Sequence, residues 1–330
     1  MRTSKLGCVV CATALAVGSA GAQRLLAANQ GDHTISVIDP ATAKAVATVA
    51  EPVPGEWVHE VAVSPDGRTA YAPVYGNSGV GKPGIDGRAL LVIDVASGRV
   101  EHTLDFGHGV RPHLPVLDAA HGRLYVTTEL DEAVTVIDTK TLRIVGKVPT
   151  GQAQSHMLAI SHDGRFGYTA NVGPGTVSVL DLVARKKLAV IPVAGTVQRI
   201  AITADDRYVF TSDQQQPRLA VVDTATRKVK QWVALPGTGY GAAATPDGRW
   251  LLVAVPRKNA VAVVDLQSMT VARTVPVGDA PQAVLVRPDG RVAYVSCAGS
   301  NAIAAIDVTR WKVERMIPAG AFDDGMAWAR

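Results

Sequence analysis

The sequence has few cysteines, few aromatic residues and little excess charge. Its 330 residues include three cysteines, and aromatic side chains make up 5% of the chain. Cys8 and Cys11 lie in an N-terminal segment that we expect to be removed. Cys297 is then the single thiol, which excludes an internal disulfide. The formal net charge of +4 is small and dispersed, which argues against a nucleic-acid partner.

Long hydrophobic runs are also lacking. The longest N-terminal run, residues 6–17, follows two basic residues and is too short to span a membrane. Ala20-Gly21-Ala22 then supplies the small residues of a cleavage site. We therefore expect a signal peptide over residues 1–22 and a single mature domain over residues 23–330. This domain should be periplasmic or secreted, without a transmembrane segment.

A short apolar phrase ending in aspartate recurs along the chain. It has seven copies, spaced by 55, 44, 43, 42, 42 and 42 residues, and they end at Asp39, Asp94, Asp138, Asp181, Asp223, Asp265 and Asp307. A second phrase lies between them, as in "SPDGR", "SHDGR", "TPDGR" and "RPDGR". Because glycine accepts positive φ at low cost, Asp-Gly between apolar runs predicts a hairpin turn.

Each unit of about 42 residues therefore predicts four short strands. In the unit from Pro276 to Ile317 these cover residues 282–286, 292–297, 302–307 and 311–317. Seven such units predict an all-β, seven-bladed β-propeller. One aspartate per blade at a strand end favours a structural role, in which it accepts hydrogen bonds in the turn between the third and fourth strands.

The two ends of the chain complement each other. The mature chain begins with "RLLAAN", which matches the second strand of a unit, and it ends with "GMAWAR", which matches the first strand. We therefore expect the C-terminal strand to join the N-terminal blade and close the ring. Closure would remove the exposed sheet edges and tie the two ends together.

At this level the chain resembles the YVTN-type β-propeller repeat proteins. The stretches that carry the resemblance are "SPDGRTAYAPV", "GRLYVTTELDEAVTVIDTKT", "GRFGYTANVGPGTVSVLD" and "DGRVAYVSCAGSNAIAAID". The tetrapeptide itself is degenerate here, since residues 125–128 read "YVTT" and residues 168–171 read "YTAN". The resemblance implies an exported seven-bladed propeller, and it implies little about activity because one fold hosts many functions.

Extra residues mark loops on one face of the expected ring. The largest insertion is the loop Tyr75–Arg88, with smaller departures in "EPVPGEWVH" (residues 51–59) and "GHGVRPH" (residues 107–113). Enlarged loops on a rigid scaffold are frequent places for function. On this face we also expect His108, Arg111 and Glu129, which could bind a polar or anionic ligand.

Aligning the first strand of every blade brings histidines together. The equivalent position at the start of this strand is occupied in the seven blades by His59, His113, His156, Gln198, Tyr240, Gln282 and Asp324. The three histidines fall on consecutive blades, although the chain has eight histidines in all. Imidazole is a common ligand of Cu, Zn and Fe, so His59, His113 and His156 predict a metal site. Glu60 could orient one imidazole, and Tyr240 or Asp324 could face the ligand.

Three function classes remain open at this point. The first is a binding or scaffold propeller, with a ligand, metal or partner on the His-bearing face. The second is a metal-dependent enzyme that uses the three histidines. The third is a lactonase-like hydrolase, which is weaker because the aligned ring offers one carboxylate, Asp324. The alternative without a metal site is that these histidines are ordinary polar residues lining a water-filled channel. We expect a monomer, and we assign neither a catalytic residue nor a specific partner.

Overall fold

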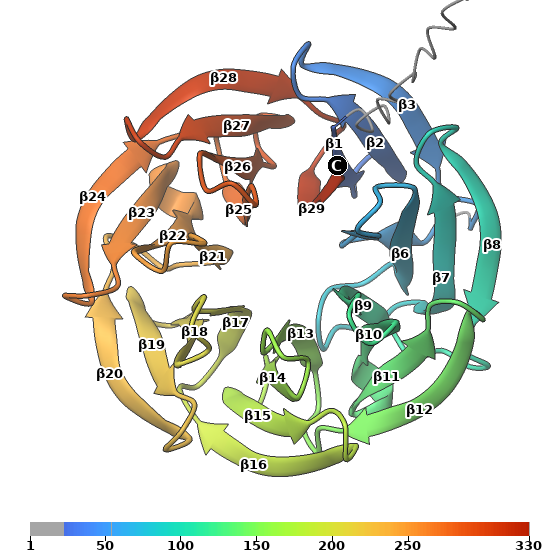
Figure 1. The fold of residues 1–330 in the computed structure, drawn as a ribbon, viewed down its shortest axis with the longest axis horizontal. Helices are drawn as coiled ribbons and strands as arrows, with labels where there is room; N and C mark the ends of the chain where they lie inside the picture. Colours follow the sequence, from blue (N-terminus) through green and yellow to red (C-terminus); the bar gives the residue numbers. More distant parts are fainter. Residues whose placement is uncertain (1–22, 54, 330) are drawn as a thin grey trace, which may run out of the picture.

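The computed structural model describes residues 23–53 and 55–329, which form seven antiparallel sheets arranged in a ring around a central channel (Figure 1). This confirms the predicted seven-bladed β-propeller. In the described residues there is no α-helix, and two short 3-10 helices, η1 (Glu129–Asp131) and η2 (Pro256–Lys258), cap two loops. No helix in this part of the chain is long and apolar enough to cross a membrane. The expected signal peptide, residues 1–22, lies outside the described residues.

Each blade has four positions, counted from the channel outward. The innermost strands are β29 (Asp323–Ala329), β4 (Trp57–Val58) with β5 (Ala62–Val63), β9 (Pro112–Asp118), β13 (Ser155–Ile160), β17 (Val197–Ile202), β21 (Ala242–Ala244) and β25 (Pro281–Val286). The second strands are β1 (Arg24–Asn29), β6 (Thr69–Gly76), β10 (Arg123–Thr128), β14 (Phe166–Asn171), β18 (Tyr208–Asp213), β22 (Trp250–Val255) and β26 (Val292–Cys297).

The outer half of each blade is equally regular. The third strands are β2 (Thr34–Asp39), β7 (Asp86–Asp94), β11 (Ala133–Asp138), β15 (Thr176–Asp181), β19 (Arg218–Asp223), β23 (Ala260–Asp265) and β27 (Ala302–Asp307). The outermost strands are β3 (Lys44–Ala50), β8 (Arg99–Asp105), β12 (Arg143–Pro149), β16 (Lys186–Pro192), β20 (Lys228–Ala234), β24 (Thr270–Pro276) and β28 (Lys312–Pro318). We number the blades 1 to 7 from the one that contains β1 and β29.

The ring closes as the sequence predicts. Strand β29 pairs antiparallel with β1, with Arg24 opposite Ala329 and Ala27 opposite Met326, so blade 1 has the order β29-β1-β2-β3. Figure 1 shows this closing strand in red, on the channel side of the blue N-terminal strands. The first and last described strands therefore belong to one sheet.

Blade 2 departs from the regular pattern. Its innermost strand is broken into β4 and β5, which both pair with β6. Strands β6 and β7 continue to a pair between Gly76 and Asp86, so the connecting loop covers residues 77–85. The expected loop Tyr75–Arg88 is thus wrong at both ends, because the flanking residues extend the two strands.

The seven repeated aspartates have the predicted structural role. Each carboxylate accepts a backbone N–H from a residue two or three positions further along, within the turn that leads to the outermost strand. Asp39, for example, accepts from Ala41 at 2.9 Å, and Asp307 accepts from Thr309 at 2.7 Å. These side chains stabilise turns and do not form a site.

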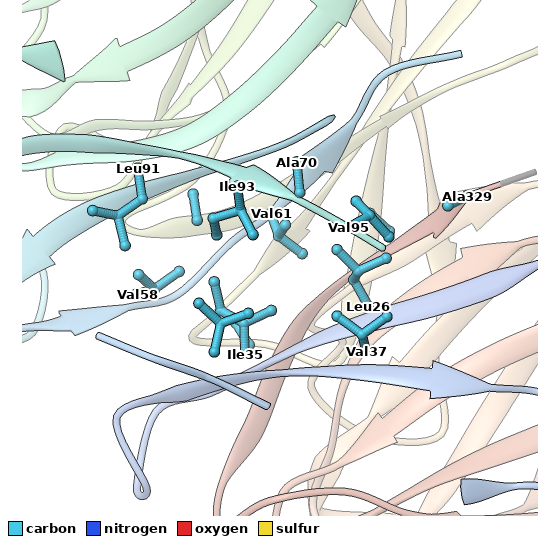
Figure 2. Packing of buried hydrophobic residues seen from close by; sticks show 14 of the residues in the cluster. Leu26, Ile35, Val37, Val58, Val61, Ala70, Leu91, Ile93, Val95 and Ala329 are labelled. Atoms are coloured by element: carbon cyan, nitrogen blue, oxygen red, sulfur yellow. The ribbon is translucent and has the colours of Figure 1, made fainter. Parts of the chain in front are cut away.

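Apolar side chains fill the space between neighbouring blades. The cluster between blades 1 and 2 includes Leu26, Ile35, Val58, Leu91 and Ala329, which are essentially inaccessible to solvent (Figure 2). Alternate residues of a strand point to opposite faces of its sheet, so each blade contributes one apolar set to each neighbour. Ala329 belongs to the closing strand, which therefore also seals this interblade core.

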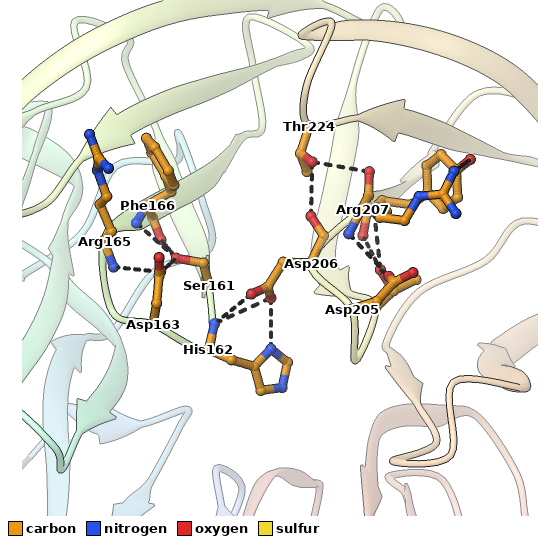
Figure 3. A network of polar contacts seen from close by, with 11 residues as sticks. Ser161, His162, Asp163, Arg165, Phe166, Asp205, Asp206, Arg207 and Thr224 are labelled. Atoms are coloured by element: carbon orange, nitrogen blue, oxygen red, sulfur yellow. Dashed lines mark hydrogen bonds and ion pairs between the residues drawn. The ribbon is translucent and has the colours of Figure 1, made fainter.

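Polar contacts join the blades at the face that bears the turns between first and second strands. Figure 3 shows one such network between blades 4 and 5, where His162 Nδ1 lies 2.6 Å from Asp206 Oδ1 and Ser161 donates to Asp163. The His162 side chain is exposed. It is at the opposite end of the innermost strand from the three aligned histidines, so it takes no part in their site.

Candidate functional site

The three aligned histidines come together at one mouth of the channel. His59 lies between β4 and β5, His113 is on β9 and His156 is on β13. The ring centroids of His59 and His113 are 5.2 Å apart, and those of His113 and His156 are 3.5 Å apart. His113 and His156 are buried and His59 is nearly so. The repeat register therefore brings these side chains into one cluster.

Tyr75 lies at the centre of this histidine cluster, and the sequence reasoning missed it. Its ring is 1% exposed. The Tyr75 centroid lies 4.9 Å from that of His59, 5.4 Å from that of His113 and 6.1 Å from that of His156. It occupies the extended end of β6, one position before Gly76, the last residue of that strand. In the sequence, this position beside the enlarged loop was the one indication of a functional role, because the residue type alone indicated none.

Glu129 connects two members of the cluster. It lies in η1, it is 3% exposed, and its Oε2 accepts a hydrogen bond of 2.9 Å from the Tyr75 hydroxyl. Its Oε1 bonds with Nδ1 of His156. With Nδ1 bound to the carboxylate, Nε2 of His156 carries the lone pair. Glu129 was expected only as a polar group on this face, and the structure gives it a contact inside the cluster.

The partner of His59 is Asp324 and not Glu60. Asp324 Oδ2 lies 3.6 Å from Nδ1 of His59, and Gln30 lies 3.1 Å from Nε2 of the same ring. Glu60, which follows His59 directly, pairs with Arg199. The expectation that Glu60 orients an imidazole is therefore wrong, because its carboxylate is engaged by a guanidinium that the sequence reasoning did not single out.

The imidazoles of His59 and His113 favour their neutral form. Burial lowers the pKa of His59, and the nearby carboxylate of Asp324 only partly offsets this effect. Burial, followed by the positive charges that His156, His59 and Arg199 can carry, lowers the pKa of His113 well below its usual range. The Nδ1 atom of His113 is buried and has no hydrogen-bond partner. A buried nitrogen with a free lone pair is a ready ligand atom.

Arg199 closes the channel below the cluster. Its guanidinium is buried and pairs with Glu60 of blade 2 and Asp324 of blade 1. Beside it lies a cavity of about 170 Å³, which is lined by Arg199 and Glu60 together with apolar residues that include Leu114, Met157, Ile200, Leu285 and Met326. The histidine cluster is thus separated from the lower part of the channel by an ion-paired side chain.

The other predicted residues are distributed around the same mouth. Gln198 donates to the Tyr240 hydroxyl at 3.2 Å, and Gln282 is half-buried, with its backbone carbonyl accepting from Gly241. Arg111 is buried and donates to Asp86 at 2.6 Å, with its guanidinium 5.9 Å from the Tyr75 ring. His108 is exposed and pairs with Asp131, so the structure does not bring it into the cluster.

The loop over residues 77–85 extends beyond its own blade. A side-chain carbon at Gly81 would lie 2.5 Å from the amide nitrogen of Gln154, and one at Gly173 would meet the same side chain. Gln154 and Gly173 belong to blade 4, whereas the loop comes from blade 2. The enlarged loop of blade 2 therefore reaches the side chain of Gln154 in blade 4.

The cluster does not have the geometry of a formed metal site in this arrangement. Among residues 23–53 and 55–329, no group of three or more His, Cys, Asp or Glu side chains is placed to hold a metal ion. The ring centroids of His113 and His156 are 3.5 Å apart, and the two ring planes are tilted by 34°. Binding of an ion would require at least one of these two rings to rotate.

Comparisons with known proteins agree on the fold. Residues 119–241 match the sequence model of the family described as Cytochrome D1 heme domain, which is less than half of the chain. Hydrazine synthase from Kuenenia stuttgartiensis is similar in structure, with a TM-score of 0.73 and 20% identity over 87% of this chain and 93% of that chain. Among curated proteins no sequence matches.

A second similar structure is the dihydro-heme d1 dehydrogenase NirN in complex with DHE. It has a TM-score of 0.65 and 15% identity over 92% of this chain and 74% of that chain. At identities this low, the structural similarity is evidence for a shared fold alone, and it carries no information about chemistry. The comparisons do not show the YVTN-type family. What they do show is that this chain shares its fold with these two structures.

Proposed function

We propose that this protein is an exported binding propeller that holds one transition-metal ion, Cu, Zn or Fe, through His59, His113 and His156. The observation that carries the proposal is the convergence of three imidazoles from three consecutive blades, one of which has a buried nitrogen without a partner. Three histidines with an open position form a recurring metal-binding arrangement.

The charge around the histidine cluster favours a cation. The carboxylates of Glu60, Glu129 and Asp324 lie in or against the cluster, whereas one guanidinium, that of Arg199, opposes them. Arg111 is paired with Asp86 and adds no net charge. Buried charge is costly unless it is compensated. A divalent ion among the imidazoles would supply the missing positive charge.

The supporting side chains have roles that follow from their contacts. Glu129 holds Nδ1 of His156, so this ring would present Nε2 to an ion, whereas the side chain of Gln30 would have to leave Nε2 of His59 before that atom could bind one. Tyr75 keeps Glu129 in place and fills the space between the rings. A bound ion with an open position would supply Lewis acidity, which is the basis of the alternative that the protein is a metal-dependent enzyme.

A haem-type ligand is a second candidate, because residues 119–241 match a haem-domain model and include Glu129, His156 and Arg199. The structure does not fit such a group in its present arrangement. The cavity beside Arg199 measures about 170 Å³, whereas cofactor pockets are roughly 300–1,000 Å³. A single ion therefore fits better than a macrocycle. The lactonase-like alternative has no further support.

Metal analysis of the purified mature protein tests this proposal. We expect about one equivalent of Cu, Zn or Fe, either as isolated or after loading and desalting, and we expect a His113→Ala variant to retain little of it. His102→Ala is the matched control, because His102 is exposed on β8, far out in its blade. Equal metal content in all three proteins, or none in the wild type after loading, would contradict the proposal. An absorbance titration with haem distinguishes the second candidate.

A further inference from the structure

The central channel contains a cavity to which every blade contributes at least one lining residue. Its volume is about 170 Å³. Apolar side chains such as Leu114, Met157 and Met326 form one part of its wall, and Glu60 and Arg199 form another. Because an apolar cavity of about 150 Å³ holds one benzene molecule, this volume suits a ligand of roughly six heavy atoms or fewer.

Two departures from the regular strand bring charge into the channel wall. Arg199 has a φ of +58°, and the register of β17 against β18 shifts between Gln198 and Ala201, so this arginine lies in a bulge. Bulges redirect side chains, and backbone strain of this kind persists only where the surrounding structure holds it. Glu60 lies in the break between β4 and β5. The equivalent positions of the other blades are uncharged: Leu114, Met157, Gly241, Ala283 and Gly325.

The buried charges beside the cavity do not balance. The two terminal nitrogens of Arg199 donate separately to Glu60 and to Asp324. The three side chains are 6–10% exposed. One guanidinium therefore faces two carboxylates, which leaves an excess of one negative charge. Because buried charge is costly unless it is compensated, a cation bound in the cavity would be stabilised.

One oxygen of Glu60 is available to such a cation. Oε1 bonds with Arg199, whereas Oε2 has no hydrogen bond to any described residue and keeps some solvent access. A side-chain carbon at Gly325 would come too close to Oε2, so this glycine leaves space beside the oxygen. Arg199 offers no comparable donor to a ligand, because its terminal nitrogens are engaged and its Nε is inaccessible.

We infer that the channel cavity binds a small primary alkylammonium ion, with the ammonium group on Oε2 of Glu60 and the alkyl chain against Leu114, Met157 and Met326. The site involves no metal ion, so the inference does not rest on the proposed function. An ammonium group has three N–H donors and offsets the excess negative charge. A second ammonium group at the far end of the chain would be buried among apolar side chains without a partner, which excludes diamines.

Calorimetric titration of the metal-free mature protein at pH 8 with n-butylammonium chloride tests this inference. We expect one binding site. Two related ligands test the chemistry, because n-butanol is of nearly the same size without the charge and 1,4-diaminobutane adds a second charge. Each should bind to the wild type about 10–100-fold more weakly than butylammonium, as expected for loss of a charged hydrogen bond or burial of an unpaired charge.

Three variants locate the site. E60Q removes the charge of the carboxylate, and A283L fills the cavity without any change in charge. E101Q is the matched control, since Glu101 is exposed on the outermost strand β8. We expect the Kd for butylammonium to rise about 10–100-fold in E60Q and A283L and to stay unchanged in E101Q. Circular dichroism and Tm show whether each variant folds.

Several results would overturn the inference. These are a wild type that does not bind butylammonium, a wild type that binds n-butanol or 1,4-diaminobutane equally well, and a folded E60Q or A283L with the wild-type Kd. If neither variant folds, the comparison of the three ligands with the wild type decides the question. Metal content is measured separately, so the alkylammonium site and the proposed metal site can each fail while the other stands.

Discussion

Oδ2 of Asp324 lies 3.6 Å from Nδ1 of His59, so the last strand of the chain contributes to a cluster that begins in the second blade. The neighbouring Gly325 makes this contact close, since its N–H donates to the His59 carbonyl at 2.9 Å. A side-chain carbon at Gly325 would lie 2.6 Å from that carbonyl oxygen. The strand that closes the ring therefore also supplies a residue of the histidine cluster.

Removal of the last nine residues, 322–330, should open the ring. The deletion takes away β29, exposes the edge of β1 and uncovers the apolar core shared by blades 1 and 2. We expect an aggregating or protease-sensitive product without the metal site. Size-exclusion chromatography and limited proteolysis provide the check. A truncated protein that stays monomeric and as stable as the full chain would refute the closure account.

A milder change at the same junction is Gly325→Ala. The added methyl group meets backbone atoms of His59 and Glu60, which cannot move aside as a flexible side chain would. We expect a loss of unfolding free energy of about 1–3 kcal/mol, as for other overpacked positions, together with weaker metal binding. Denaturant unfolding and a zinc titration measure the two effects. Unchanged values in both would show that the close approach is unimportant.

Much of this architecture could be predicted from the sequence, because repetition encodes it. Seven aspartate-terminated phrases predicted seven blades, and register alone placed His59, His113 and His156 together. The roles of Tyr75 and Arg199 were not predicted. The position of Tyr75 depends on the extension of β6, and that of Arg199 depends on a bulge in β17. Both are departures from the repeat, and a method based on the repeat register does not see them.

The carboxylate of Glu129 should matter for metal binding through His156. Glu129→Gln removes the charge that holds Nδ1 of His156, and Tyr75→Phe removes the hydroxyl that holds Glu129. We expect metal affinity to fall about 10–100-fold in the first variant and less in the second. Competition with a chromogenic chelator measures the Kd. Glu132→Gln, three residues away and exposed, is the control. Equal affinities in Glu129→Gln and Glu132→Gln would contradict this role.

Asp323 should make the protein less stable as pH rises. Burial raises its pKa from 3.8 to about 7, and its Oδ1 has no hydrogen-bond partner. Between pH 4 and pH 7 the unfolded chain releases this proton while the folded chain keeps it, so the unfolding free energy declines across that window. Above pH 7 the loss is complete, up to about 4 kcal/mol for a difference of about three pKa units.

Asp323→Asn isolates this effect. The amide cannot ionise, so the variant should lose less stability between pH 5 and pH 8 than the wild type and should be the more stable protein at pH 8. Urea unfolding at both pH values gives the comparison, with the exposed Glu314→Gln as the control. Parallel changes in the wild type and Asp323→Asn would show that this carboxyl does not titrate as described.

Anomalous diffraction from crystals of the metal-loaded protein, recorded at the absorption edge of the bound metal, tests the central claim most directly. The account predicts a single strong peak at the channel mouth, about 2 Å from a nitrogen of each of His59, His113 and His156, with the ring centroids of His113 and His156 further apart than 3.5 Å. A peak beside an exposed histidine such as His121 or His162, or no peak at the channel mouth, would contradict it.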